Sequence, residues 1–198
     1  MTRIKAARGR CLSSSRSTRR HAGNALYCTA LVLFAVVIAA CTGCGRRGKA
    51  MPTVDEKYVS DVTAAIRDCA TEEETIARVT ALLEDIEDPE QIRGLAYICD
   101  EMVPNVSLPS TIRSNAYQAW SLCVLRLRDI GRAGSEEAVQ QLWLMHTSGR
   151  YDAGDAEWFP TCISEVGPPA IPVLEKVRED RAMARAIIKA IREGRVLQ

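Results

Sequence analysis

Two cysteines and one histidine are the side chains whose types and spacing could support chemistry. Cys41 and Cys44 form a Cys-x-x-Cys motif, which elsewhere indicates a redox or metal site. His146 is the one histidine that follows Cys41, and a histidine with a suitable partner can act as a general base. Because the sequence indicates no partner for His146, we expect it to pack near the end of a helix.

Acidic residues in the segment 150–157 could bind a cation. Asp152, Asp155 and Glu157 lie there, but they lack the ligand spacing and the placed glycine of a calcium loop. Helix capping by Asp155 explains this segment better. The sequence therefore predicts no metal site, no catalytic residue set and no non-covalent cofactor, which argues against an enzyme.

The charge of the chain is unevenly distributed, although its formal net charge is only +1. Residues 1–40 contain seven Lys and Arg and no Asp or Glu. The part from Cys41 onward therefore carries 19 Lys and Arg against 25 Asp and Glu, a net charge of −6. An acidic domain repels nucleic-acid phosphates, which proteins bind with clustered Lys and Arg. We therefore expect no nucleic-acid partner.

The order of residue types in 1–40 is typical of a secretory signal, with a basic region before an uncharged apolar run over residues 25–40. A helix of this run rises about 24 Å, less than the roughly 30 Å of a hydrocarbon core, which favours cleavage. Extension of the run to Gly45 would make it long enough to span, so an uncleaved single-pass anchor is the alternative. Both topologies export the rest of the chain.

The end of the apolar run resembles the lipobox of bacterial lipoproteins, since Ile38-Ala39-Ala40-Cys41 places a branched apolar residue and two small residues before a cysteine. The resemblance implies that diacylglycerol is attached to the Cys41 thiol and that Cys41 becomes the mature N-terminus. It also implies a lipid anchor in the cell membrane or the outer membrane, on the extracytoplasmic or periplasmic face. Residues 41–53, which are polar and interrupted by Gly and Pro, are then a tether.

The apolar residues from Thr53 onward recur at helical spacing, and no strand-like alternation of useful length occurs. The sequence therefore predicts an all-α domain over residues 54–198 with some eight helices. Two capping boxes and an Asp-Pro pair mark helix starts at Thr53 with Glu56, Thr71 with Glu74, and Asp88 with Pro89. The later helices are expected over residues 109–130, which Gly131 ends, and over 135–148, 158–166, 168–179 and 181–193.

The apolar stripes of these helices define the expected core. The second helix contributes Ile76, Val79, Leu82, Leu83 and Ile86. The three tryptophans also fall at core spacing, so packing is favoured over a ligand cage for Trp120, Trp143 and Trp158.

Four cysteines lie on apolar stripes, where a free cysteine behaves as a small hydrophobe: Cys69, Cys99, Cys123 and Cys162. Export to an oxidising compartment would permit disulfides. The pairing among these four and Cys44 stays open, and the sequence is compatible with one bridge or with none.

Two stretches, residues 76–98 and 167–191, resemble HEAT repeats of the bacterial, lyase-associated type. Each has an apolar helix, an aspartate at the turn, and an arginine five residues later that begins a second helix: Asp88 with Arg93, and Asp180 with Arg185. In that family such residues brace the turn. The resemblance implies antiparallel helix pairs stacked into a short α-α superhelix, whose concave surface binds proteins.

These patterns together predict a non-catalytic scaffold or adaptor module of a bacterial envelope, held at the membrane by the lipid on Cys41 and bound to a protein partner. The alternative is an enzyme or a chromophore-lyase-like helper that uses the groove of the helical repeats. A concave apolar or aromatic patch would favour binding. A deep pocket that holds His146 with a carboxylate would favour chemistry.

Overall fold

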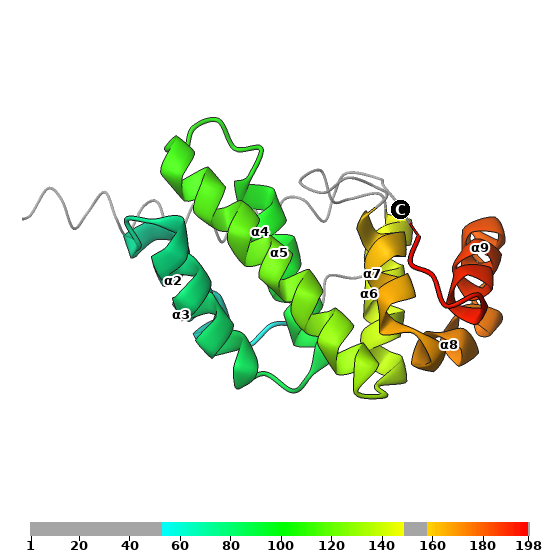
Figure 1. The fold of residues 1–198 in the computed structure, drawn as a ribbon. Coiled ribbons are helices and arrows are strands. Elements are labelled where there is room, and N and C mark those ends of the chain that lie inside the picture. The colour runs from blue at the N-terminus through cyan, green and yellow to red at the C-terminus, as the bar shows by residue number, and fades with distance from the viewer. Residues whose placement is uncertain (1–52, 149–157, 198) are drawn as a thin grey trace, which may run out of the picture. The chain divides into compact units, whose positions relative to one another are not determined.

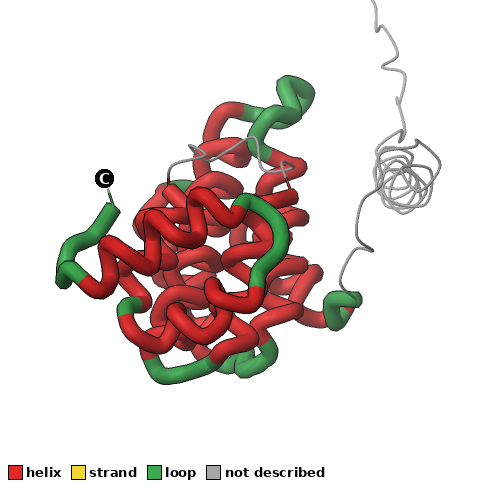
Figure 2. The backbone as a smooth tube through the Cα atoms, turned by 90° about the vertical axis from the view of Figure 1, so that its right-hand side faces the viewer, coloured by secondary structure: helices red, strands yellow, loops and turns green. Residues whose placement is uncertain are grey.

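The structure, a computed structural model, describes residues 53–148 and 158–197, which form helices joined by loops (Figure 1). Figure 2 shows the same helices as a tube, seen from the end where the chain finishes. The described residues contain eight α-helices, one 3-10 helix and no strand, so the predicted all-α class is confirmed. The helices are α2 (Glu56–Asp68), α3 (Glu72–Glu84), α4 (Pro89–Met102), α5 (Ser110–Arg132), α6 (Glu136–Ser148), α7 (Trp158–Val166), the 3-10 helix η2 (Pro168–Ala170), α8 (Ile171–Lys176) and α9 (Arg181–Arg192).

Several predictions concern residues outside the described ones. These are the signal over residues 1–40, Cys41 and Cys44 in the tether, and the acidic residues of segment 150–157. Within residues 53–148 and 158–197, no helix combines the length and the apolar character needed to cross a membrane.

The longest helix, α5, is the centre of the fold. It packs against α2, α3, α4, α6 and α7, and its Trp120 side chain is fully buried. Two further side chains of α5 bind the ends of neighbouring helices. Asn115 Nδ2 donates to the carbonyl oxygens of Ile66 and Cys69 at the end of α2, both at 3.1 Å, and Arg126 Nε donates to the carbonyl oxygen of Leu83 in α3 at 3.1 Å. These bonds satisfy carbonyl groups that a helix end leaves without intrahelical partners.

The first helix start differs from the prediction. The N-cap of α2 is Asp55, whose side chain accepts a hydrogen bond of 2.8 Å from the backbone N–H of Lys57. The expected capping box of Thr53 with Glu56 does not form, because Glu56 is already the first helical residue. An aspartate one residue before the helix serves the exposed N–H groups better than a threonine three residues away.

The next two helix starts agree with the prediction. Thr71 Oγ1 accepts from the backbone N–H of Glu74 at 3.2 Å, and the Glu74 carboxylate accepts from the backbone N–H of Ala70 at 2.9 Å. Asp88 caps α4 by accepting from the backbone N–H of Glu90 at 2.9 Å, with a proline at the first helical position. Local sequence was sufficient at both sites because each cap involves residues at most four positions apart.

The predicted apolar stripe of the second helix is confirmed at Val79, Leu82, Leu83 and Ile86, which are buried or packed against the core, but not at its first position. Ile76 is 38% exposed, whereas Thr75, Val79 and Leu83 are buried. The Thr75 hydroxyl donates to the carbonyl oxygen of Thr71 at 3.0 Å, so its burial leaves no unsatisfied donor. The prediction for Ile76 was wrong because a satisfied threonine can occupy a core position that hydrophobicity alone assigns to its neighbour.

Gly131 does not end α5, which continues to Arg132. The glycine is buried at the crossing of three helices: a β-carbon built on it would lie 3.2 Å from Val166 of α7 and 3.3 Å from Val139 of α6. Its lack of a side chain therefore serves close packing. The positive φ that follows the helix is found at Gly134, at 106°.

The helices on either side of Asp88 do not form the packed antiparallel pair predicted from the repeat resemblance. Instead, α4 packs along α5, and α3 packs against α2 and α5. With 23 residues, α5 is long enough to pack against both of these helices. The second predicted pair differs less, since α8 and α9 do pack together, although α8 ends at Lys176 instead of residue 179.

Candidate functional site

An open groove runs between α8 and α9, with a volume of about 660 Å³. Its floor is apolar and consists of Leu174, Val177, Ala184 and Ile188. Six exposed cationic side chains line its walls: Lys176, Arg178, Arg181, Arg185, Lys189 and Arg192. We refer to these residues as the basic groove.

Helical spacing creates the longer wall of the basic groove. Arg181, Arg185, Lys189 and Arg192 follow one another at intervals of four, four and three residues, which places them on one face of α9. The buried residues of α9 are Ala184, Ile187, Ile188 and Ala190, and two of them, Ala184 and Ile188, adjoin the charged face and border the groove. The amphipathic pattern of this helix thus fixes which side chains reach solvent.

Half of these cations have an ion-pair partner. The pairs are Lys176 with Glu136 at 3.2 Å, Lys189 with Glu193 at 3.8 Å, and Arg192 with Glu175 at 3.0 Å. Arg178, Arg181 and Arg185 form no ion pair with the described residues. The basic groove therefore presents three uncompensated positive charges to solvent.

A smaller hollow of about 260 Å³ adjoins the basic groove and shares Val177 and Arg178 with it. Its other walls come from α6, α8 and the turn before α9: Gln140, Trp143, Leu144, Val173 and Glu179. Together the two hollows form a continuous depression that is lined by residues of α9, α8 and α6.

His146 has a partner that the sequence did not indicate. Its Nε2 lies 3.2 Å from Asp180 Oδ2, and its side chain is 12% exposed. Asp180 also caps α9 by accepting from the backbone N–H of Met183 at 3.3 Å. The pair joins the end of α6 to the start of α9. Neither residue lines the basic groove or the smaller hollow.

The aspartates and arginines expected to brace the two turns have separate roles. Asp88 and Asp180 are the N-caps of α4 and α9. Arg93 lies 3.6 Å from Glu90 and forms no hydrogen bond or ion pair with Asp88, while Arg185 lines the basic groove and forms none with Asp180. Arg185 thus belongs to the candidate site and not to a turn.

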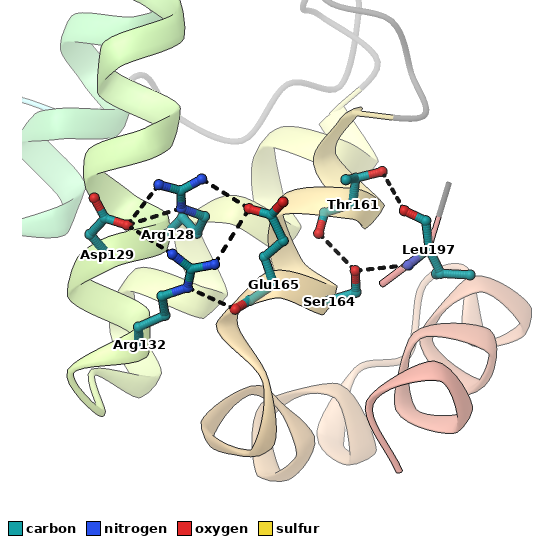
Figure 3. A network of polar contacts seen from close by, with 7 residues as sticks. All are labelled: Arg128, Asp129, Arg132, Thr161, Ser164, Glu165 and Leu197. Atoms are coloured by element: carbon teal, nitrogen blue, oxygen red, sulfur yellow. Dashed lines mark hydrogen bonds and ion pairs between the residues drawn. The ribbon is translucent and has the colours of Figure 1, made fainter. Parts of the chain in front are cut away.

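A polar network fixes α7 against α5 (Figure 3). Arg128 Nη1 lies 2.9 Å from Glu165 Oε2, and Arg132 Nε donates to the Glu165 carbonyl oxygen at 2.8 Å. Asp129 also contacts Arg128, at 2.9 Å. Burial lowers the pKa of Arg128, but hydrogen bonds to Asp129 and Glu165 outweigh it and raise the pKa above its usual value. Arg128 is therefore permanently charged in this network.

The same helix α7 holds the chain segment that follows α9 (Figure 3). Thr161 Oγ1 donates to the carbonyl oxygen of Leu197 at 3.0 Å, and the backbone N–H of Leu197 donates to Ser164 Oγ at 3.1 Å. Because Asp180 is bound to His146 at the other end, α9 is attached to the rest of the fold before its first residue and after its last. The longer wall of the basic groove is thereby held in place.

The tryptophans contribute to the core as predicted. Trp120 is fully buried and Trp143 is 4% exposed, while Trp158 is half-buried. Ring centroids of Trp120 and Trp158 lie 5.1 Å apart, and those of Trp120 and Phe159 lie 5.9 Å apart with nearly perpendicular planes. These aromatic contacts join α5 to α7 in the interior, and the polar network of Figure 3 joins the same two helices.

The four cysteines of the helical domain are free thiols in the structure. Cys99, Cys123 and Cys162 are buried, and Cys69 is half-buried. A hydrogen bond with Cys123, together with burial, raises the pKa of Cys99 well above its usual value, and burial raises the pKa of Cys162 to about 12. Protonated, buried thiols act as small apolar side chains, as the sequence predicted for these positions.

Comparisons of the chain with protein-family models, with curated proteins and with solved structures found no match. No group of three or more His, Cys, Asp or Glu among residues 53–148 and 158–197 is arranged to hold a metal ion. Function is therefore argued from the basic groove, its neighbours and the N-terminal sequence.

Proposed function

We propose that this protein is a lipid-anchored, extracytoplasmic protein-interaction module of a bacterial envelope. The proposed location rests on the basic region and the apolar run of residues 1–40 and on the resemblance of residues 38–41 to a lipobox. Several acyl chains on one cysteine hold a protein firmly, since each buried methylene contributes about 0.8 kcal/mol. The helical domain would then face the extracytoplasmic space on a short tether.

The observation that carries the proposal is the basic groove. It is open, it has an apolar floor, and its Arg178, Arg181 and Arg185 have no ion-pair partner among residues 53–148 and 158–197. Residues 53–167 carry 9 Lys and Arg against 21 Asp and Glu, whereas residues 168–198 carry 7 against 4. A local concentration of positive charge around an apolar floor, on an otherwise acidic domain, supports recognition of another macromolecule.

The proposed relation to HEAT repeats is now supported mainly by α8 and α9. These two helices pack together, are separated by a turn that contains Asp180, and expose one face as a groove. In helical-repeat proteins such exposed faces bind partners. We propose a HEAT-like pair at this end of the domain, with α2 to α5 forming a differently packed support.

A second candidate function, an enzyme with His146 as general base, is favoured by the contact of His146 with Asp180. A carboxylate on one ring nitrogen can orient a histidine for proton transfer. The two functions are separated by complementing a deletion strain with His146→Gln. An interaction module is expected to complement fully, whereas an enzyme that depends on His146 would not, even when the variant is folded and membrane-bound.

Metabolic labelling with a fatty-acid analogue tests the anchor. The wild-type chain is expected to incorporate the label, Cys41→Ser to lose it, and Cys44→Ser to retain it as the matched control. Equal labelling of Cys41→Ser and wild type would reject the assignment of the lipid to Cys41.

Site-specific photo-crosslinking in living cells tests the interaction. A benzophenone amino acid in place of Arg185 is expected to give a protein adduct, because that position lies in the basic groove. The same amino acid in place of Arg78, an exposed residue of α3, is the control and is expected to give none. Adducts of equal yield at both positions, or none at position 185, would contradict the proposal.

A further inference from the structure

The geometry points to an acidic protein segment with apolar side chains as the occupant of the basic groove. This inference rests on the proposed function and adds the chemical class of the partner. Its basis is the combination, in one groove, of an apolar floor with three arginines that form no ion pair among the described residues.

The charges along the groove indicate that the partner is negatively charged. Of the six cations along the groove, only Lys176, Lys189 and Arg192 are paired with carboxylates in the part of the chain that the structure describes. Exposed like charges repel one another. An anion that enters between the helices reduces this repulsion among Arg178, Arg181 and Arg185, so its binding is electrostatically favourable. The acidic remainder of the domain repels that anion elsewhere, which directs it to this end.

The apolar floor indicates a polypeptide as the source of the anion. Leu174, Ala184 and Ile188 are buried at the bottom of the groove, and Val177 is half-buried beside them. A peptide with carboxylates on one side and apolar side chains on the other meets walls and floor at once, as amphipathic segments do in grooves between helices. Phosphodiester backbones satisfy only the walls.

The position of the groove argues against a lipid surface. In the helical unit, α2 follows the tether, and α9 lies at the opposite end (Figure 1). A bilayer surface is flat, whereas the cations of α8 and α9 face a concave space of about 660 Å³. A chain segment can enter that space and a membrane surface cannot.

The test measures binding of a labelled 12-residue peptide, equal in length to α9, to the detergent-solubilised full-length chain. The peptide carries rows of Glu and Leu at helical spacing. Two control peptides replace all Glu by Gln or all Leu by Ala. We expect the Gln peptide not to bind, the Ala peptide to bind about tenfold more weakly, and added salt to weaken binding of the Glu-Leu peptide.

Charge-reversed proteins locate the site. Arg181→Glu with Arg185→Glu is expected to weaken binding of the Glu-Leu peptide by about tenfold or more. The matched control, Arg67→Glu with Arg78→Glu, changes the net charge equally at two exposed positions of α2 and α3 and is expected to leave binding unchanged. Equal weakening by both double variants would overturn the inference, because it would show a general effect of net charge.

Two other occupants are tested in the same assay. Displacement of the peptide by phosphatidylglycerol added to the micelles would overturn the inference in favour of anionic lipid. Salt-sensitive dimers in sedimentation, lost in the Arg181→Glu, Arg185→Glu variant, would overturn it in favour of a second copy of this chain. If the peptide does not bind but crosslinks persist at position 185, the partner chemistry is rejected and the interaction function stands.

Discussion

The two ends of the helical domain have opposite charge and use it differently. Helices α2 to α4 and their caps, residues 55–102, carry 4 Lys and Arg against 14 Asp and Glu, and several of these acids cap helix starts. Residues 168–198 carry 7 Lys and Arg against 4 Asp and Glu, and Arg178, Arg181 and Arg185 form no ion pair with any residue that the structure describes. Charge at the acidic end supports local structure, whereas part of the charge at the basic end has no partner within the described helices and loops. That difference is the strongest indication of where this protein binds.

Packing differs between the two ends as well. Leu95, Cys99 and Cys123 in α4 and α5 are completely buried, so these two helices enclose a closed interior. Between α8 and α9 the half-buried Val177 borders an open groove. One end of the domain is therefore closed around α5, whereas the other end, where α8 packs against α6 and α9 against α7, leaves a groove open to solvent.

Thiol alkylation should give the largest difference, because it compares a half-buried thiol with fully buried ones. We expect iodoacetamide to modify Cys69 in the folded full-length chain and to modify Cys99, Cys123 and Cys162 more than about a thousandfold more slowly, since these require opening of the domain. A pKa of about 12 for Cys162 leaves roughly one thiol in ten thousand ionised at pH 8, and its reactivity should rise with pH. Peptide mapping by mass spectrometry measures each site.

Denaturant provides the control for the alkylation experiment, because all four thiols should react alike in the unfolded chain. Cys99 lies in α4 and Cys123 in α5, at the closed end of the domain. Cys162 lies in α7, which packs against α9. Faster modification of Cys162 than of Cys99 in the folded chain would show that the basic end opens independently. It would contradict the view that the groove is rigidly held.

Truncation of a side chain should cost more in the closed interior than in the groove. We expect Trp120→Ala to lower the free energy of unfolding by about 3 to 5 kcal/mol, since it empties a fully buried site among Trp158 and Phe159. Val177→Ala, at the border of the groove, should cost less than about 1 kcal/mol. Urea titration of both variants measures the difference, and similar costs would show that the groove floor is part of the closed core.

The turn before α9 should show an intermediate effect. Asp180 caps α9, contacts His146 and has φ of +42°, in the left-handed region that Asp and Asn tolerate better than Ala. We expect Asp180→Ala to lower the free energy of unfolding by about 1 to 2 kcal/mol. Asp180→Asn should cost less because it keeps a capping oxygen and tolerates this backbone conformation. Equal losses in urea titration would mean that the carboxylate charge, and not the cap, is what stabilises the turn.

Charge reversal should have the smallest effect on the free energy of unfolding. Whether that free energy rises or falls shows whether the groove arginines stabilise the fold. Arg181→Glu places an acid in the first turn of α9, and Arg185→Glu places an acid four residues before Lys189; both changes are favourable in a helix. The double variant should therefore gain a few tenths of a kcal/mol. The control, Arg67→Glu with Arg78→Glu, should lose a similar amount because Arg67 lies in the last turn of α2. Thermal unfolding at low salt measures both, and a clear loss for the groove variant would mean that its arginines serve stability.

Much of the helical architecture could be predicted from the sequence because helix starts and lengths depend on residues that lie close together in the chain. The caps at Thr71 and Asp88 involve residues at most four positions apart, and α5 was expected over residues 109–130 and found at Ser110–Arg132. Where a core position depends on another helix, the prediction was wrong: Ile76 is exposed, and Gly131 packs against two helices instead of ending α5.

The candidate site was only partly readable from the sequence. The spacing of Arg181, Arg185, Lys189 and Arg192 was available as a signal of one charged face, but the repeat resemblance assigned Arg185 to the turn. The contact of His146 with Asp180 joins residues 34 positions apart, which no local pattern indicates. Charge spacing along a helix is local information, whereas the identity of the opposite wall is not.

By itself, the sequence determined where α3 and α4 begin, that the chain after the tether is helical, and which residues of 1–41 resemble an export and lipidation signal. These properties follow from the covalent order of side chains within a few turns. Only the tertiary structure decided that α4 packs along α5 and not α3, that three helix ends are bound by side chains of α5, and that α8 and α9 leave a basic groove between them. Such pairings depend on the fit of surfaces far apart in the chain, and each is selected against all the alternatives that the same apolar stripes would allow.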